Sequence, residues 1–271
     1  MKSSREEKQE FYLKLLENER RFHRLFCDVE EHEYFSMYHN RSFADDPIFN
    51  HFILSERVMM GEDSHQMSRA ISSIRASHVG SAINASIFVE NFWSNSPNFE
   101  KVAIENGYRI TGQMEILAKK LSPNDSLPKD QRTRVETTKD IDLWNELFMS
   151  SFSIPASWRE ELRKRLRIIL ENKSASLIVA SEIEARNLGQ GVLLTYIQPT
   201  DIMGVYCVGT DPRWRGRGIA RAMMTYAERS AREVGCRFIT LQTLSADGVA
   251  PMYKKMGYVT EFVRDLLWSP A

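Results

Sequence analysis

Along the second half of the chain, apolar residues follow two different periods. Nearly continuous apolar runs at 177–183, 191–197 and 204–210 are typical of buried strands. From 219 to 234 the apolar residues instead recur every three or four positions, which predicts an amphipathic helix that ends at Gly235. The same criteria predict helices beginning near Asp140 and Pro155 and a short helix at 250–255, with strands at 134–137, 237–241 and 259–268.

The first half shows the same mixture of periods. It predicts an amphipathic helix at 6–26, short aromatic-rich strands within 33–54, helices at 64–76 and 98–106, and strands at 86–89 and 110–117. Residues 122–133 contain two prolines and little apolar content, which is typical of a linker. We therefore predict two domains, at 1–121 and 134–271, and an α/β fold with a mixed sheet.

Bulk properties narrow the function. The chain has 271 residues, enough for two ordinary domains, and its net charge is zero, which argues against nucleic acid or an anionic membrane as a partner. No apolar signal core or spanning stretch occurs, and three scattered cysteines favour a cytoplasmic location. Neither the cysteines nor the six histidines have metal-ligand spacing, so no metal is expected.

One turn carries the clearest chemistry. Residues 211–220 read Asp-Pro-Arg-Trp-Arg-Gly-Arg-Gly-Ile-Ala and connect an apolar strand to the helix that begins near Ile219. The first N–H groups of a helix lack partners within it and carry partial positive charge. Gly216 and Gly218 allow an anion to approach the backbone, while Arg215 and Arg217 add positive charge. The pattern favours a phosphate site, although a plain basic turn is the simpler alternative.

The type of phosphate ligand follows from what the turn lacks. It has no Gly-Lys-Ser/Thr of a Walker loop, and Arg221 stands where a dinucleotide fingerprint needs its third glycine. The remaining pattern, Arg/Gln-x-x-Gly-x-Gly/Ala, is met by Arg215, Gly218 and Ala220. It resembles the pyrophosphate-binding turn of the GNAT superfamily of N-acetyltransferases, which bind acetyl-coenzyme A. The resemblance implies that residues 215–220, including Ile219, hold the pyrophosphate.

A second motif supports this resemblance. Residues 252–258, Met-Tyr-Lys-Lys-Met-Gly-Tyr, are similar to the second GNAT signature, whose tyrosine directs its hydroxyl at the coenzyme A sulfur. This implies that Tyr253 acts as general acid toward the departing thiolate. The preceding strand, Val208-Gly209-Thr210, matches the strand whose backbone pairs with the pantetheine arm in the family. A helix-packing tyrosine and an ordinary central strand are the alternatives.

The general base is not identified. Glu136, Glu182 and Tyr206 are candidates by strand position only, and none is assigned. The asparagine that the family often has before its tyrosine is also absent; Ser245 or Asp247 is the nearest substitute.

The first half resembles a degenerate copy of the second. A helix, a strand and a Gly-Tyr pair (Gly107-Tyr108) precede its last strand, much as Gly257-Tyr258 precedes the last strand of the chain. Residues 60–65 hold one glycine and two acids before the helix, so no coenzyme A is expected there.

We therefore predict an N-acetyltransferase that moves an acetyl group from acetyl-CoA to a primary amine of a small molecule or peptide. Direct attack is expected, because no cysteine has an activating setting. A silent acyl-CoA sensor or assembly module is the first alternative, and a nucleotide-binding enzyme is a weaker one.

Overall fold

In a computed structural model, residues 4–44, 46–60, 64–78, 85–93, 96–122, 132–183, 189–198 and 201–268 are described. The chain divides into two compact units that do not follow chain order. Unit 1 consists of residues 1–9, 26–117 and 242–271, and unit 2 consists of residues 10–25 and 118–241. Most of the predicted linker, 123–131, lies outside the described residues, and the boundaries at 121 and 134 stay a prediction.

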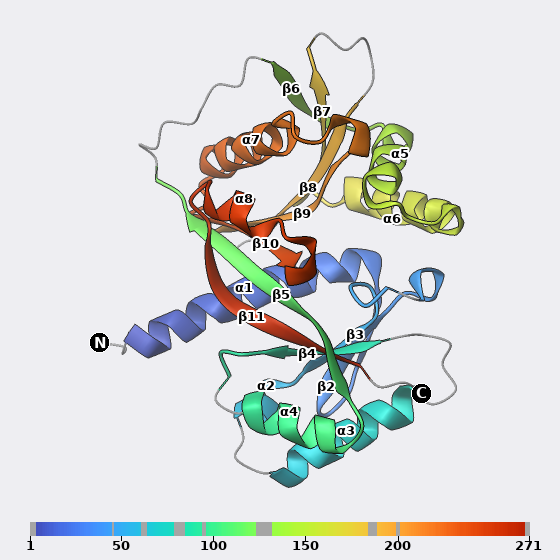
Figure 1. The fold of residues 1–271 in the computed structure, drawn as a ribbon, viewed down its shortest axis with the longest axis vertical. Coiled ribbons are helices and arrows are strands. Elements are labelled where there is room, and N and C mark those ends of the chain that lie inside the picture. Colours follow the sequence, from blue (N-terminus) through green and yellow to red (C-terminus); the bar gives the residue numbers. More distant parts are fainter. Residues whose placement is uncertain are drawn as a thin grey trace. The chain divides into compact units, whose positions relative to one another are not determined.

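The elements follow the predicted periods closely (Figure 1). Up to residue 120 they are α1 Ser4–Phe26, β1 Asp28–Glu31, β2 Phe35–His39, β3 His51–Leu54, α2 Glu56–Met60, α3 Ser64–His78, β4 Ser86–Glu90, α4 Ser96–Glu105 and β5 Arg109–Lys120. From residue 133 they are β6 Thr133–Thr138, α5 Ile141–Phe152, α6 Arg159–Glu171, β7 Ala175–Glu182, β8 Gly191–Gln198, β9 Ile202–Thr210, α7 Ile219–Glu233, β10 Phe238–Leu244, α8 Ala250–Lys254 and β11 Val259–Trp268. The sequence pattern missed β1 and α2.

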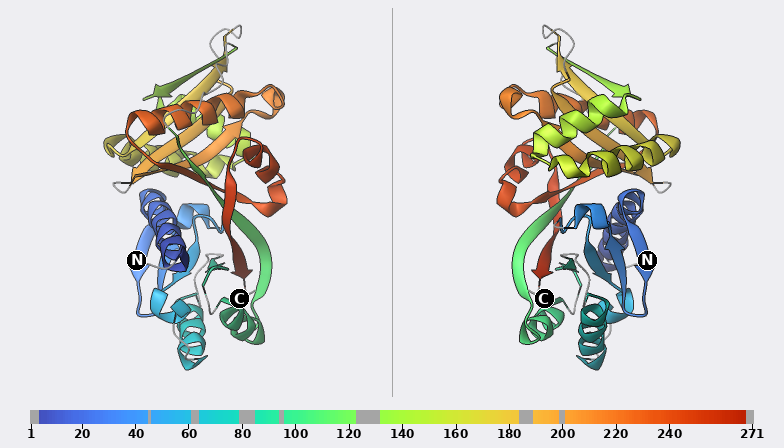
Figure 2. Two further views of the ribbon diagram at one scale, coloured as in Figure 1. Left: turned by 90° about the vertical axis from the view of Figure 1, so that its left-hand side faces the viewer. Right: turned by 90° about the vertical axis from the view of Figure 1, so that its right-hand side faces the viewer.

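Unit 2 is built on strands in the order β10-β9-β8-β7-β6. β6 to β9 pair antiparallel, whereas β9 and β10 are parallel, as expected for strands joined by the crossover helix α7. The two views in Figure 2 show α7 on one face of these strands and α5 with α6 on the other. The buried face of α7 includes Ile219, Met223 and Ala227, which explains the spacing of its apolar residues.

Unit 1 has strands in the order β1-β2-β3-β4-β11-β5. Its core is strongly aromatic: the His51 ring stacks between those of Tyr38 and Phe88, at centroid distances of 4.8 and 4.2 Å. β3 and β4 are parallel, and β4 pairs antiparallel with β11, the last strand of the chain. The expected α/β fold with a mixed sheet is therefore confirmed.

The predicted echo between the halves appears in the element order. The first half runs β3-α2-α3-β4-α4-β5 and the second runs β9-α7-β10-α8-β11, so the first half has one additional short helix, α2, and each half begins with a parallel strand pair joined through helix. The first half contributes the end of β5 to unit 2, and the second half contributes all of β11 to unit 1. β11 lies beside β4 in unit 1, and the end of β5, from Ala118, belongs to unit 2, where the Leu121 N–H donates to the Arg237 carbonyl at 2.8 Å.

Both exchanged strands bring a cation to a buried carboxylate. In unit 1, Arg264 of β11 donates to Glu90 of β4 at 3.0 Å, and these side chains are 0% and 3% exposed. In unit 2, Lys119 of β5 contacts Glu228 of α7 at 2.8 Å, with 18% and 2% exposed. A buried carboxylate requires such a partner, so each unit depends on a residue from the other half of the chain.

Candidate functional site

The site begins where β9 leaves its neighbours. The β9–β10 register ends at Val205 paired with Leu241, so the β10 side of Tyr206–Thr210 takes no part in it. On the other side, Leu194 pairs with Tyr206 and Val192 with Gly209, so one β8 residue faces two β9 residues. This is a β-bulge, and Cys207 within it has a φ of 56°. The segment Val208–Thr210 therefore lies beyond the β9–β10 pairing.

The turn after β9 contains two glycines with left-handed backbone angles. Gly216 and Gly218 have φ values of 77° and 89°, and a Cβ at either would meet no atom within 4 Å. Gly218 is the N-cap of α7 and no side chain caps the helix. The glycines therefore provide a left-handed turn, and the N–H groups at the start of α7, Ile219 and Ala220 among them, face no capping group.

The three arginines of the turn contact different partners. Arg213 forms a fork with Asp211, at 3.0 and 2.8 Å, and this hydrogen bonding lowers the pKa of the Asp211 carboxyl. Arg215 donates to the Ser151 carbonyl at 2.8 Å and the Thr210 carbonyl at 3.3 Å, which ties the turn to α5 and β9. Arg217 lies over the Trp214 ring at 4.6 Å, with its guanidinium 3.6 Å from Glu182. Arg217 is exposed and carries charge beside the open turn.

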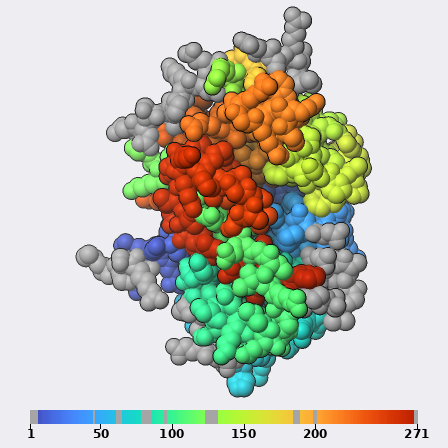
Figure 3. Space-filling view, viewed as in Figure 1, coloured from blue at the N-terminus to red at the C-terminus, as the bar shows by residue number. Residues whose placement is uncertain are grey.

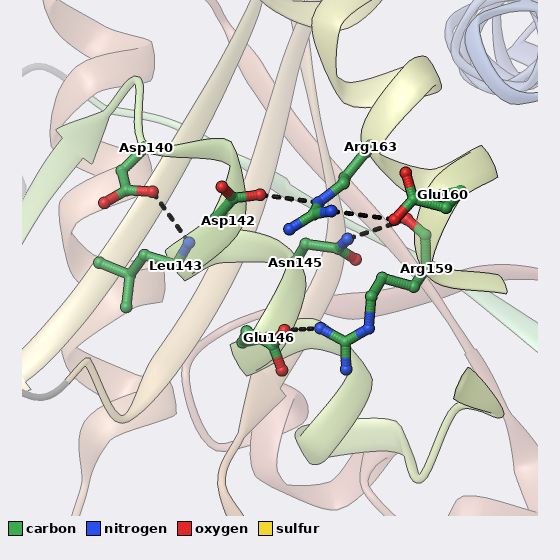
Figure 4. A network of polar contacts seen from close by, with 8 residues as sticks. All are labelled: Asp140, Asp142, Leu143, Asn145, Glu146, Arg159, Glu160 and Arg163. Carbon is green, nitrogen blue, oxygen red and sulfur yellow. Dashed lines mark hydrogen bonds and ion pairs between the residues drawn. The ribbon is translucent and has the colours of Figure 1, made fainter. Parts of the chain in front are cut away.

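The C-terminal end of α5 supports β9. A Cβ at Gly209 would lie 2.7 Å from Ser151 Cβ and 2.8 Å from Phe152 Cε2, so the glycine accommodates this helix. Gly209 therefore has a packing role against the end of α5. Figure 4 shows how α5 is fixed: Asp140 caps it at Leu143, and Arg163 of α6 reaches Asp142 at 2.8 Å.

Tyr253 lies on α8 in unit 1 and is 6% exposed. Its ring packs edge-on against Tyr258, with centroids 6.1 Å apart. Burial raises the pKa of Tyr253 to about 12, so the phenol stays protonated over the physiological range. The helix itself is held by Glu115 of β5, which accepts hydrogen bonds from Lys254 at 2.7 Å and Thr260 at 2.6 Å.

Each of the three candidate bases contacts another residue of unit 2. Glu136 is exposed on β6 and pairs with Arg134, and Glu182 faces Arg217 of the turn. The Tyr206 hydroxyl donates to Asn18 of α1 at 2.7 Å. Burial raises the pKa of the Cys207 thiol to about 12, which disfavours a thiolate nucleophile. Ser245 and Asp247 are exposed in a 3-10 turn of unit 1.

No group of three or more His, Cys, Asp or Glu side chains among the described residues is arranged to hold a metal ion. No helix in this part of the chain is long and apolar enough to cross a membrane.

Comparison with known proteins identifies the domain that contains this turn. Residues 141–258 match the family model described as the acetyltransferase (GNAT) family. The match includes the bulged strand, the turn, α7 and Tyr253, and confirms that the C-terminal half contains a GNAT acetyltransferase domain. The comparison with curated protein sequences finds no match.

Solved structures show the same fold over most of the chain. A GCN5-related N-acetyltransferase from Kribbella flavida is 16% identical, with a TM-score of 0.69, and the alignment covers 94% of this chain and 93% of that one. One from Sphaerobacter thermophilus is 16% identical, with a TM-score of 0.66 and coverage of 88% and 81%. A functionally unknown conserved protein from Staphylococcus epidermidis is 15% identical, with a TM-score of 0.65 and coverage of 90% and 95%.

Proposed function

We propose that this chain, whose residues 141–258 form a GNAT acetyltransferase domain, transfers an acetyl group from acetyl-CoA to a primary amine. One observation carries the proposal: the open, bulged end of β9 runs directly into a glycine turn and an uncapped helix. An extended thioester with a diphosphate at its far end needs both parts, in this order. A plain basic turn would need neither the bulge nor the open strand edge.

The donor is assigned by chemistry. The backbone N–H groups of residues 215–220 would bind the pyrophosphate, where the partial charge of the helix favours an anion. The backbone of Val208, Gly209 and Thr210 would pair with the amides of the pantetheine arm. Arg217 would add charge beside the pyrophosphate, whereas Arg215 would act mainly through its two carbonyl contacts.

Direct transfer of the acetyl group to the amine is consistent with the raised pKa of the Cys207 thiol in β9. The amine nitrogen attacks the thioester carbonyl carbon, the C–N bond forms, the C–S bond breaks, and the amine loses a proton. An acetyl-enzyme would need a thiolate, and the raised pKa of Cys207 opposes one. The attacking amine must be neutral, and without an assigned base it is expected to arrive in that form or to lose its proton through water.

Tyr253 is assigned to the departing sulfur, on the resemblance of residues 252–258 to the second family signature. A thiol has an ordinary pKa of ~8.5 and a phenol ~10. With the pKa of Tyr253 raised to about 12, full proton transfer to the thiolate is unfavourable. A hydrogen bond to the developing negative charge is favourable, so Tyr253 acts as a donor that stabilises the leaving group.

The test is release of free thiol from acetyl-CoA with a panel of amines: aliphatic diamines, amino sugars, lysine and short peptides. Tyr253→Phe should lower kcat by about tenfold to a hundredfold and leave the Kd for CoA unchanged. Tyr258→Phe, which also removes a buried tyrosine hydroxyl beside it, should leave kcat nearly unchanged. Equal activity in Tyr253→Phe and wild type would remove the assigned role.

One observation favours a second function, an acyl-CoA sensor. Glu136, Glu182 and Tyr206 each contact another residue of unit 2, so no assigned base accompanies the donor turn. A sensor would bind acetyl-CoA tightly and release no thiol with any amine of the panel. Turnover with one amine, lost in Tyr253→Phe, would decide for the transferase.

A further inference from the structure

Residues of α1, outside the family-matched region, contact β9, the strand proposed to bind the donor. Residues 10–25 of α1 belong to unit 2, although they precede residue 141 by more than a hundred positions. Asn18 is 0% exposed, and its carboxamide oxygen accepts the Tyr206 hydroxyl at 2.7 Å. Its amide nitrogen points to the carbonyls of Tyr196 and Ile202, at 3.3 and 3.5 Å. One side chain of α1 therefore contacts β8 and β9 together.

The Tyr206 ring is held at its face as well as at its hydroxyl. Phe22, one helical turn after Asn18, stacks on it with centroids 3.6 Å apart and planes 2° apart. Room for this arrangement comes from Gly204, where a Cβ would lie 2.1 Å from the Asn18 oxygen. Any other residue type there would displace the Asn18 or Tyr206 side chain and so break their contact.

The position of Tyr206 makes this contact relevant to the site. Tyr206 is the first residue after the β9–β10 register ends, and it immediately precedes Cys207, whose φ is 56°. A non-glycine residue in that region costs about 1–2 kcal/mol and persists only where its surroundings fix the backbone. Tyr206, which adjoins the strained residue, is held both at its ring and at its hydroxyl.

We propose that Asn18 and Phe22 of α1 are positioning residues for donor binding: through Tyr206 they hold the bulge that keeps Val208–Thr210 open to the pantetheine arm. This rests on the proposed function, because it concerns the same strand edge. The polypeptide that binds the donor is then α1 together with the family-matched domain.

The test measures CoA affinity by calorimetry in the full chain, with the unfolding temperature of each variant alongside. Asn18→Ala and Tyr206→Phe each remove one hydrogen bond and should each raise the Kd by about tenfold. The double variant should be little weaker than either single variant, because both changes remove the same contact. Tyr206→Phe keeps the ring and its stacking, so it remains informative if Asn18→Ala fails to fold.

Asn50→Ala is the matched control. Asn50 is also 0% exposed and makes three hydrogen bonds, to Asn40, Phe43 and Asp46, but it lies in unit 1. It should lower the unfolding temperature and leave the Kd unchanged. If Asn18→Ala and Tyr206→Phe lower the unfolding temperature while the Kd stays at the wild-type value, the positioning role is wrong and the proposed function stands. If wild type binds no CoA, both are wrong.

Discussion

The two parallel strand pairs of this chain share a topology, but only one has the features that the proposed donor site requires. Along the chain, α3 lies between the parallel strands β3 and β4 of unit 1, and α7 lies between the parallel strands β9 and β10 of unit 2. β3 has four residues, all buried, of which three pair with β4. β9 has nine residues, a bulge and an end that extends beyond its partner. In our proposal, donor binding thus depends on strand length, the bulge and the turn, which the shared topology alone does not provide.

The segments that precede α3 and α7 also differ, in the sign of their charge. Residues 60–63, before α3, read Met-Gly-Glu-Asp, whereas residues 215–218, before α7, read Arg-Gly-Arg-Gly. Acidic side chains repel a diphosphate and guanidinium groups attract it. α7 also lies at the surface in Figure 3, where its residues are orange, and its exposed positions include Arg221 and Arg229.

The largest predicted effect concerns unit 1. Arg264→Ala leaves the Glu90 carboxylate buried without its main partner, so we expect unfolding in denaturant to show a loss of about 3–5 kcal/mol. Arg57→Ala is the control, because its ion pair with Glu33 is more than 60% exposed on both sides and is expected to contribute less than about 1 kcal/mol. Equal losses would show that the Arg264–Glu90 pair contributes no more to stability than an exposed ion pair.

Lys119→Ala makes the corresponding change in unit 2. Glu228 loses its contact at 2.8 Å, but Lys119 is partly exposed and water can replace it in part. We expect a smaller loss, of about 1–3 kcal/mol, in the same unfolding measurement. Lys14→Ala, at an exposed pair with Glu10 on α1, should change stability little. A loss larger than that of Arg264→Ala would reverse the predicted order.

The pH dependence of kcat/KM distinguishes ionisation of the Tyr253 hydroxyl from ionisation of the acceptor amine. Tyr253 acts in its protonated form, which persists below its pKa of about 12. The value of kcat/KM should therefore rise with pH as the amine loses its proton and reach a plateau, without a decline below about pH 10. A decline that Tyr253→Phe abolishes, centred well below pH 10, would contradict the raised pKa.

The smallest effect is a pH dependence confined to unit 1. Burial and the neighbouring charge of Asp265 raise the pKa of Glu100 to about 7, above its ordinary value of 4.5. Because the folded state binds this proton more tightly, unit 1 should lose stability as pH rises from about 4.5 to 7. Glu100→Gln should flatten this part of the curve in thermal unfolding and stabilise the protein above pH 7. A steeper curve in the variant would overturn the assignment.

Much of this architecture could be predicted from sequence because it depends on local spacing. The apolar face of α7, the glycines of the turn and the two family motifs are all contained in short segments. The exchange of β5 and β11 could not be predicted, because pairing between strands more than a hundred positions apart leaves no local pattern. Cys207 gave no sign of a bulge, since its left-handed backbone occurs without a glycine. Asn18 and Tyr206 lie 188 positions apart, so only the folded chain shows their contact.

The most direct test of the proposed donor site is calorimetric titration of the full chain with CoA. It compares wild type with two variants, Gly218→Ala and Gly235→Ala, whose substitutions lie at opposite ends of α7. Gly218 and Gly235 have φ values of 89° and 84°, and a Cβ at either meets nothing within 4 Å, so both substitutions impose similar strain. We predict one site per chain in wild type, a Kd raised at least about tenfold in Gly218→Ala, and an unchanged Kd in Gly235→Ala. Two sites per chain, equal weakening in both variants, or no heat in wild type would contradict a donor site built by the bulged strand and its turn.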